Sequence, residues 1–271
     1  CLAFTGSVAT GRKVGIAGIS RGARINLEMG GKDPFIVCGD LDSEAVRIAA
    51  RGGAWAAYLN VGQVCTSSER FYVMENVYDE YVSAFLEHTK SLVIGDPLDA
   101  KTDLGPMISA TQRGKALAQV EAAVDAGGVL LTGGDDAGFE TGHYLSPCVL
   151  TGVPEDTDLM TEETFGPVAP ILPVSNLEEA IGKANGLDFG LGANIYTRDL
   201  KTAITCLKGV RAGSVWINDP LTDNDAGPFG GFKNSGIGRE LGTEGLDAFR
   251  EAKHVHMDSE IEVKDWWYPY G

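Results

Sequence analysis

The sequence predicts an α/β fold with a largely parallel sheet, and three observations support that prediction. Short apolar runs alternate along the chain with longer segments whose apolar residues recur at helical spacing. Glycine marks the turns between them, with 36 Gly among 271 residues. The alternation continues without a linker, an internal repeat or a low-complexity segment, which indicates one architecture through most of the chain.

The first expected elements are two short strands around a helix. Residues 2–5 indicate a strand, and Ser7 then caps a helix that begins over 8–13. Residues 24–28 alternate as a strand does, and Met29-Gly30-Gly31 ends it. The exposed amides at the start of such a helix suit a phosphate group.

The remaining elements continue the alternation. Strands are expected at 34–38, 70–74, 129–131, 193–197 and 214–218. Helices are expected at 42–58, 78–92, 111–126, 175–185 and 200–208. The first of these helices is rich in Ala, and Gly127-Gly128 ends the third.

The C-terminal segment has a different pattern. Residues 253–264 alternate like a long, half-exposed strand, and an aromatic cluster follows at 266–270. Such an edge favours pairing with another subunit, and a tail folded onto its own domain is the alternative. His254 and His256 share one face of this strand, but no acid or thiol is placed to complete a metal site.

Charge and composition exclude several classes of partner. There are 38 acidic and 22 basic residues, so the formal charge is −16, which disfavours nucleic acid and anionic lipid. No apolar run is long enough for a membrane helix, and the first residues lack the pattern of a secretory signal. A cytoplasmic protein is therefore expected. Because the chain opens with Cys1 inside an apolar run, we expect it to be a piece of a longer protein.

The cysteines indicate a free thiol. Five of them are widely spaced and form no C-x-x-C pair, so neither a disulfide framework nor a zinc site is predicted. Cys65 lies in the small, polar loop 60–68 between an expected helix and strand. Backbone amides and polar groups near a thiol lower its pKa and make it a nucleophile. Cys65 is therefore the candidate nucleophile, with packing as the alternative.

Two acidic positions are candidates for other roles. Glu28 ends an apolar strand beside Gly30-Gly31, where burial would raise its pKa toward neutrality and suit a general base. A solvated glutamate at a strand end is the alternative. Glu163 lies in a Glu-Glu-Thr-Phe-Gly-Pro turn, and a carboxylate there can bridge two ribose hydroxyls. The alternative is that these residues form a charged turn with no role in binding.

Taken together, these motifs and their order closely resemble the aldehyde dehydrogenase superfamily. The resemblance covers essentially the whole chain. It rests on Phe4-Thr5-Gly6-Ser7 with Gly11, Leu27-Glu28-Met29-Gly30-Gly31-Lys32, Gly62-Gln63-Val64-Cys65, Glu162-Glu163-Thr164-Phe165-Gly166-Pro167, and the segment from Pro228 to Gly242.

The resemblance implies a mechanism for the candidate catalytic residues. Cys65 would attack an aldehyde, its own backbone amide would help to hold the oxyanion, and hydride would leave to NAD. Glu28 would activate water to hydrolyse the resulting thioester to a carboxylic acid. NADP is the alternative cofactor.

The resemblance also implies where the cofactor binds. Ser7 would meet the pyrophosphate, and Glu163 would hold the nicotinamide ribose beside Phe165. Gln112 and Lys115 are expected to add ribose contacts. Gly6, Met29 and Gly30 complete the expected cofactor site.

The family's chains are nearly twice as long as this one, so the resemblance implies a C-terminal portion. We predict a remnant of a Rossmann-type dinucleotide-binding domain at 1–29 and a catalytic domain at 30–234. A return segment and an oligomerisation strand follow at 235–271, which implies a homodimer or homotetramer. The stretch from Glu28 to Cys65 is about one helical turn longer than in typical members, near 51–54.

The loop after residue 218 bears on the substrate, because in the family it lines the aldehyde funnel. Asp219 and Asp223 would favour a cationic aldehyde such as betaine aldehyde or an aminoaldehyde, with Phe229 beside them. Acids that simply face solvent are the alternative. A non-catalytic protein on the same scaffold, an incomplete catalytic fragment and a coenzyme A-acylating semialdehyde dehydrogenase are the competing functions.

Overall fold

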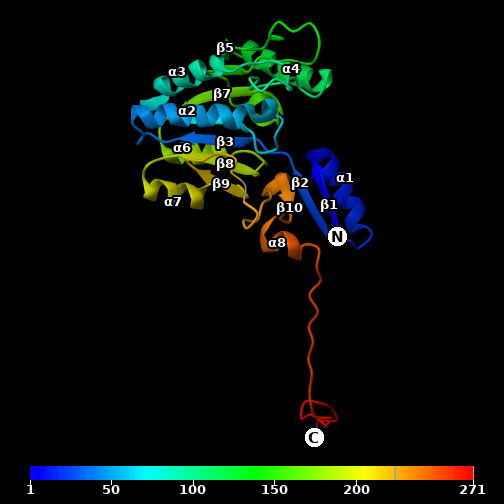
Figure 1. The fold of residues 1–271 in the computed structure, drawn as a ribbon. Helices are drawn as coiled ribbons and strands as arrows, with labels where there is room; N and C mark the ends of the chain where they lie inside the picture. Colours follow the sequence, from blue (N-terminus) through cyan, green and yellow to red (C-terminus); the bar gives the residue numbers. More distant parts are fainter. Residues whose placement is uncertain (223, 271) are drawn as a thin grey trace.

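The computed structural model describes residues 1–222 and 224–270, which form two sheets flanked by helices (Figure 1). The smaller sheet has the order β1-β2-β10. It consists of β1 (Leu2–Gly6), β2 (Ile25–Met29) and β10 (Gly236–Ile237), with α1 (Val8–Ile19) packed against it. β1 and β2 are parallel, whereas β10 pairs antiparallel with β2 and places Gly236 opposite Glu28.

The larger sheet has seven strands in the order β5-β6-β7-β4-β3-β8-β9. These are β3 (Asp33–Val37), β4 (Ser68–Met74), β5 (Val129–Thr132), β6 (Cys148–Thr151), β7 (Val168–Val174), β8 (Gly192–Tyr196) and β9 (Ser214–Ile217). All neighbours are parallel except β5, which runs antiparallel to β6. The predicted α/β class with a largely parallel sheet is therefore confirmed.

Helices cover both faces of the larger sheet (Figure 1). α2 (Ser43–Tyr58) and α3 (Glu75–Ser91) pack together on one face, and α6 (Leu177–Asn185) and α7 (Leu200–Gly209) lie on the other. Between α2, α3 and the sheet is an aromatic core in which the ring centroids of Phe35 and Phe71 are 5.1 Å apart. This packing fixes β3 and β4, and the loops that precede these strands carry Gly30 and Cys65.

The shorter elements connect these layers. α4 (Ala110–Asp125) packs beside β5 and α5 (Asp158–Thr161). The remaining short helices are η1 (Leu59–Gly62), η2 (Lys233–Ser235) and α8 (Gly242–Asp247). No helix among the described residues has the length and apolar character that crossing a bilayer requires.

The expected strands and helices over 2–218 are confirmed, but β6 and β7 were not predicted. β7 lies between β6 and β4, yet it contains Pro170 and Pro173. Proline lacks the amide that a ladder uses, so its presence argues against a central strand in a sequence. The predicted domain boundaries stay a prediction, although β2 and β3 fall in different sheets.

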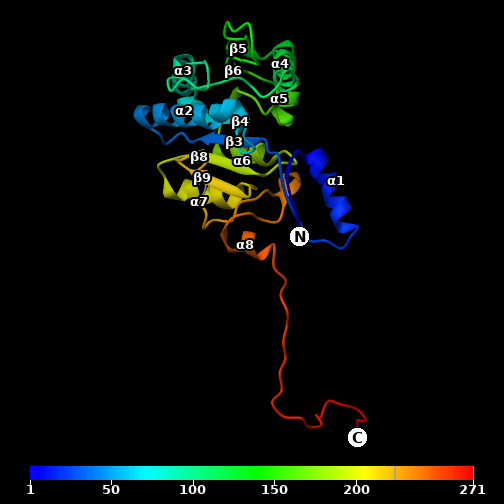
Figure 2. The same cartoon turned by 45° about the vertical axis from the view of Figure 1, so that its right-hand side comes forward.

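The strand predicted at 253–264 does not form within the single chain, and its pairing with another subunit stays a prediction. The segment is exposed and irregular, and it extends away from the body of the molecule toward the aromatic cluster (Figure 2). A strand persists only where its backbone groups pair with a neighbour. Among the described residues no strand pairs with this segment, so its alternating pattern alone produces no sheet structure.

Candidate active site

A cavity of about 410 Å³ contains every residue that the sequence assigned to catalysis or cofactor binding. Its wall combines the ends of β1 and β2 in the smaller sheet, the start of α1, the loop before β4, the start of α4 and the turn before β7. The lining residues are Thr5, Gly6, Ser7, Glu28, Met29, Gly30, Cys65, Gln112, Lys115, Glu163 and Phe165. Only Thr5 in this set was not predicted as a site residue.

Ser7 begins α1 at one side of the cavity. Its hydroxyl oxygen accepts a hydrogen bond from the Thr10 amide at 3.4 Å, as the sequence predicted for an N-cap. Because the first amides of a helix point toward its N-terminus, the Ser7 end of α1 presents partial positive charge to the cavity. That arrangement suits a phosphate group.

Glu28 has the properties of a general base. Its side chain is only 3% exposed, and its Oε1 atom has no hydrogen-bond partner among the described residues. Burial, helped by the negative charge of Glu240, raises the pKa of Glu28 to about 7. A hydrogen bond from the Gly231 amide and the charge of Arg239 oppose this rise. The expected shift toward neutrality is confirmed.

The expected lowering of the Cys65 pKa is wrong. Burial raises the pKa of this thiol to about 11, and the charges of Asp33, Glu28 and Glu163 act in the same direction. The Thr66 amide opposes the rise, but it does not outweigh loss of solvent and three acids. Cys65 is therefore mainly a neutral thiol near pH 7, and a nearby base has to accept its proton.

The turn before β7 brings Glu163 and Phe165 into the cavity. Glu163 Oε1 accepts a hydrogen bond from the Gly31 amide at 3.3 Å, and burial raises the pKa of Glu163 to about 7. A Cβ atom at Gly30 would lie 2.6 Å from the Glu163 carboxylate carbon, so this approach requires glycine. Phe165 adopts a positive φ of 53°, which helps to place its ring at the cavity wall.

Gln112 and Lys115 contact the same turn from α4. Gln112 Nε2 donates to the carbonyl oxygens of Thr164 at 2.9 Å and Phe165 at 3.1 Å. Lys115 Nζ donates to the carbonyl oxygen of Glu163. Both side chains line the cavity, and in this structure their polar ends hold the turn.

The two predicted substrate residues that the structure describes, Asp219 and Phe229, are not brought into the cavity. Asp219 is exposed, and its charge adds to the effect of burial on the pKa of Tyr196, which rises to about 12. Phe229 is half-buried and pairs through its backbone with Glu240, at 2.7 Å in both directions. Neither residue lines the cavity. Asp223 lies outside the described residues.

Sequence reasoning missed several charged residues near the site. Lys32 and Glu69 form a buried ion pair next to the turn that carries Glu163. Glu240 acts on the pKa of Glu28. The available signal was the pair Glu69-Arg70, two charges directly before the apolar run of a strand. No group of three or more potential metal ligands occurs within 1–222 and 224–270.

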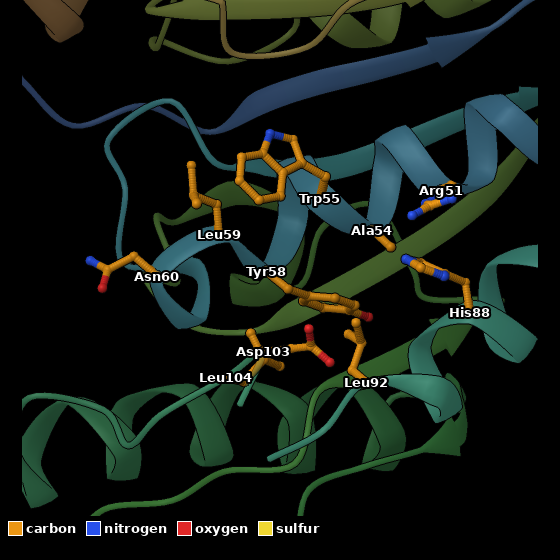
Figure 3. A pocket seen from close by; sticks show the side chains of 10 residues that line it. All are labelled: Arg51, Ala54, Trp55, Tyr58, Leu59, Asn60, His88, Leu92, Asp103 and Leu104. Carbon is orange, nitrogen blue, oxygen red and sulfur yellow. The ribbon is translucent and has the colours of Figure 1, made fainter. Parts of the chain in front are cut away.

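A second cavity, of about 250 Å³, lies between α2 and the segment that follows α3 (Figure 3). Trp55 and Tyr58 form much of its apolar wall, while Arg51, His88 and Asp103 place polar groups around it. None of the predicted site residues that the structure describes lines it. The extra helical turn predicted between Glu28 and Cys65 was placed near 51–54. These residues lie within the continuous helix α2, and Arg51 and Ala54 contribute to the wall of this second cavity.

Comparison with known proteins identifies the family. The model of the aldehyde dehydrogenase family matches residues 1–255, so the chain belongs to this family. A mitochondrial aldehyde dehydrogenase of Leishmania tarentolae is 39% identical over 264 residues, which is 97% of this chain and 52% of the relative. The human mitochondrial aldehyde dehydrogenase is also 39% identical, over 94% of this chain and 48% of its own length.

Solved structures give the same result. An NAD-dependent aldehyde dehydrogenase from Sinorhizobium meliloti matches with a TM-score of 0.93 at 38% identity, over 97% of this chain and 52% of that one. A betaine aldehyde dehydrogenase from Staphylococcus aureus, in complex with NAD+, matches with a TM-score of 0.90 at 31% identity. That match covers 98% of this chain and 52% of the other. The chain thus spans about half the length of these relatives.

Proposed function

We propose that this chain oxidises an aldehyde to a carboxylic acid with a nicotinamide cofactor as hydride acceptor. One observation carries the proposal: a thiol, Cys65, and a carboxyl group with a pKa near neutrality, Glu28, line one cavity. The same cavity contains a helix N-terminus at Ser7 and a second carboxyl group at Glu163. A nucleophile, a base and groups that suit the phosphate and ribose of a nicotinamide cofactor are parts that this reaction needs.

The residues around the cavity fit a dinucleotide. Ser7 and the first turn of α1 suit the pyrophosphate, and the Glu163 carboxylate can accept hydrogen bonds from ribose hydroxyls. Phe165 offers an apolar face beside them. The cofactor, when bound, supplies a hydride acceptor. We assign Gly6, Met29, Gly30, Gln112 and Lys115 to the wall of the same site.

The chemical steps follow from the protonation states of Cys65 and Glu28. Glu28 in its ionised form accepts the thiol proton, because the neutral thiol is a poor nucleophile. The Cys65 sulfur then attacks the carbonyl carbon, and the Cys65 backbone amide helps to stabilise the oxyanion of the thiohemiacetal. Loss of hydride from that carbon leaves a thioester on Cys65. Glu28 first releases the thiol proton to solvent and, ionised again, accepts a proton from the water that attacks the thioester. Collapse of the tetrahedral intermediate breaks the carbon–sulfur bond and releases the acid, and the Cys65 sulfur takes the proton back from Glu28.

The test is NADH formation by the purified 271-residue chain with a panel of aldehydes. The Cys65→Ser variant is expected to form no NADH. Glu28→Gln lacks the base for both the thiol and the water, so it is expected to form NADH much more slowly than the unaltered chain. Cys1→Ser is the matched control, because it replaces an exposed thiol outside the cavity. This variant should form NADH at the same rate as the unaltered chain. Absence of NADH with every aldehyde would contradict the proposal for these residues and favour a non-catalytic or incomplete unit.

We further propose a cationic aldehyde, such as betaine aldehyde or an aminoaldehyde, as substrate. The formal charge of −16 and the acidic loop at Asp219 support this choice, because they attract cations to the surface. One matched structure is named as a betaine aldehyde dehydrogenase. A higher kcat/KM for succinic semialdehyde than for betaine aldehyde would refute the electrostatic argument.

Cofactor type, assembly and location complete the proposal. We propose NAD in preference to NADP, since matched relatives include a protein named as NAD-dependent, although another is named as NADP-dependent. A homodimer or homotetramer in the cytoplasm is proposed for the assembled enzyme. Comparing kcat/KM for the two cofactors, sedimentation of the purified chain and fractionation against a mitochondrial marker test these three statements. Several of the matched relatives are named as mitochondrial, so the last comparison needs that marker.

A further inference from the structure

Beneath the proposed cofactor site is a buried ion pair. Lys32 is 1% exposed and Glu69 is 2% exposed, and Lys32 Nζ lies 2.5 Å from Glu69 Oε2. Removing both charges from water costs about as much free energy as their attraction returns, so such a pair contributes little net stability. The pair therefore matters for how it orients the groups to which it is hydrogen-bonded.

Both carboxylate oxygens of Glu69 also accept hydrogen bonds from the turn that carries the ribose-binding candidates. Oε2 accepts from the Thr164 amide at 2.7 Å, and Oε1 accepts from the Phe165 amide at 2.8 Å. Lys32 Nζ donates to the Thr164 hydroxyl at 2.9 Å. Charge-assisted bonds of this length are stronger than neutral ones and restrict orientation more. The backbone between Glu163 and Phe165 is thus held from inside the protein.

The pair joins three segments of the cavity wall. Glu69 lies four residues after Cys65 in the sequence, and Lys32 lies four residues after Glu28. The carboxylate of Glu69 therefore connects the nucleophile's segment, the base's segment and the turn with Glu163. Arg70 extends the connection, because its Nε atom donates to the Lys32 carbonyl oxygen at 2.8 Å.

We propose that Glu69 is a positioning residue for the cofactor: by binding the Thr164 and Phe165 amides, it fixes the turn in the geometry in which Glu163 and Phe165 meet the nicotinamide ribose. It touches no reacting atom and acts through that turn. The proposal rests on the function proposed above for the same cavity. Glu69 therefore sets cofactor affinity, and the chemistry at Cys65 and Glu28 proceeds without it.

The test uses the full chain and the variant Glu69→Gln. Glutamine keeps the shape but has one acceptor oxygen, so its NH2 group faces an amide that needs an acceptor. Hydrogen exchange at the Thr164 and Phe165 amides is expected to accelerate by about tenfold or more, and the Kd for NAD+ in calorimetry is expected to rise on the order of tenfold. The substitution also removes the negative charge beside Lys32. Because burial lowers the pKa of Lys32, its ammonium group can then release a proton and need not stay buried as an unpaired charge.

A control variant and a double variant distinguish a positioning role from misfolding. Glu80→Gln breaks an exposed ion pair with Arg47 far from the cavity, and it should leave exchange and NAD+ affinity unchanged. If Glu69→Gln does not fold, the double variant Glu69→Gln with Lys32→Met removes both buried charges. One of the two amides, Thr164 or Phe165, still lacks an acceptor in that variant. A cofactor-free readout, hydrolysis of the acetyl thioester on Cys65, should keep its rate, whereas a general structural collapse would lower it.

The outcomes separate this proposal from the function on which it rests. Faster exchange at both amides together with weaker NAD+ binding and unchanged thioester hydrolysis supports it. Unchanged exchange overturns it, and so does faster exchange with unaltered NAD+ affinity or with equally impaired hydrolysis. If the unaltered chain binds no NAD+, the proposed cofactor site itself is refuted and the positioning role falls with it.

Discussion

The pH dependence of thioester hydrolysis tests the role of Glu28 most directly. With a pKa of about 7, Glu28 is about 10% ionised at pH 6 and about 90% ionised at pH 8. Because only the ionised form accepts a proton from water, hydrolysis is expected to accelerate about tenfold over this interval. A glutamate with its ordinary value of 4.5 would already be ionised at pH 6 and would give no such rise.

The assay needs no cofactor, so it isolates Cys65 and Glu28. An activated acetyl ester transfers its acetyl group to the Cys65 thiol, peptide mapping verifies the position, and mass spectrometry then follows loss of the acetyl group at each pH. Glu28→Gln is expected to hydrolyse slowly, with only the background due to hydroxide. Glu162→Gln changes an exposed neighbour of the turn outside the cavity and is the matched control, which should keep the midpoint near pH 7.

Two results would refute the reasoning. A rate that is flat between pH 6 and pH 8 in the unaltered chain would show that Glu28 does not titrate there during hydrolysis. A Glu28→Gln variant that keeps the same midpoint would assign the titration to another group. Either result would remove the observation on which the proposed mechanism depends.

Further predictions concern neighbouring charges, glycines and stability. Glu240→Gln removes a charge that raises the pKa of Glu28, so the midpoint of the same assay is expected to move to lower pH, and an upward shift would contradict this. Gly62→Ala should lower the free energy of unfolding by about 2 kcal/mol or more, since φ is +71° and Cβ would overlap a backbone carbonyl. Gly114→Ala, where Cβ meets nothing inside α4, should instead raise it by about 0.5–1 kcal/mol in denaturant titrations. Glu28 and Glu163 both have pKa values raised above 4.5 in the folded state, which therefore binds more protons than the unfolded state between about pH 4.5 and 7. The thermal midpoint should accordingly fall as pH rises through that window, and a rise would be inconsistent with these two acids as its main source.

The parts of the fold that the sequence predicted are those set by local chemistry. Ser7, Asp42 and Ser109 each accept a hydrogen bond from a first-turn amide of the helix they precede, and apolar periodicity identified the helices that follow. β7 was missed because Pro170 and Pro173 argue locally against a strand, whereas its neighbours in the sheet stabilise one. The tail shows the reverse case, since 253–264 has the pattern of a strand but no partner among the described residues.

For the site, the sequence predicted which residues take part, but it predicted only some of their pKa shifts correctly. The rise of the Glu28 pKa followed from an acid on an apolar strand, because burial acts on a carboxyl group in one direction. The same burial acts on a thiol in the same direction, but the sequence suggested small polar neighbours and therefore the opposite shift for Cys65. The acids that reinforce the rise come from residues 28, 33 and 163, which only the folded chain brings together.

The difference between Cys65 and Glu28 has a mechanistic consequence. The pKa of the Cys65 thiol, about 11, lies above that of the Glu28 carboxyl group, about 7, so proton transfer from Cys65 to Glu28 is unfavourable. The thiol is therefore mainly protonated near pH 7. A bound cofactor carries a positively charged nicotinamide ring, which would favour the thiolate electrostatically. Alkylation of Cys65 at pH 7 is accordingly expected to be slow in the free chain and faster with NAD+, and equal rates would show that the acids around the thiol do not control its reactivity.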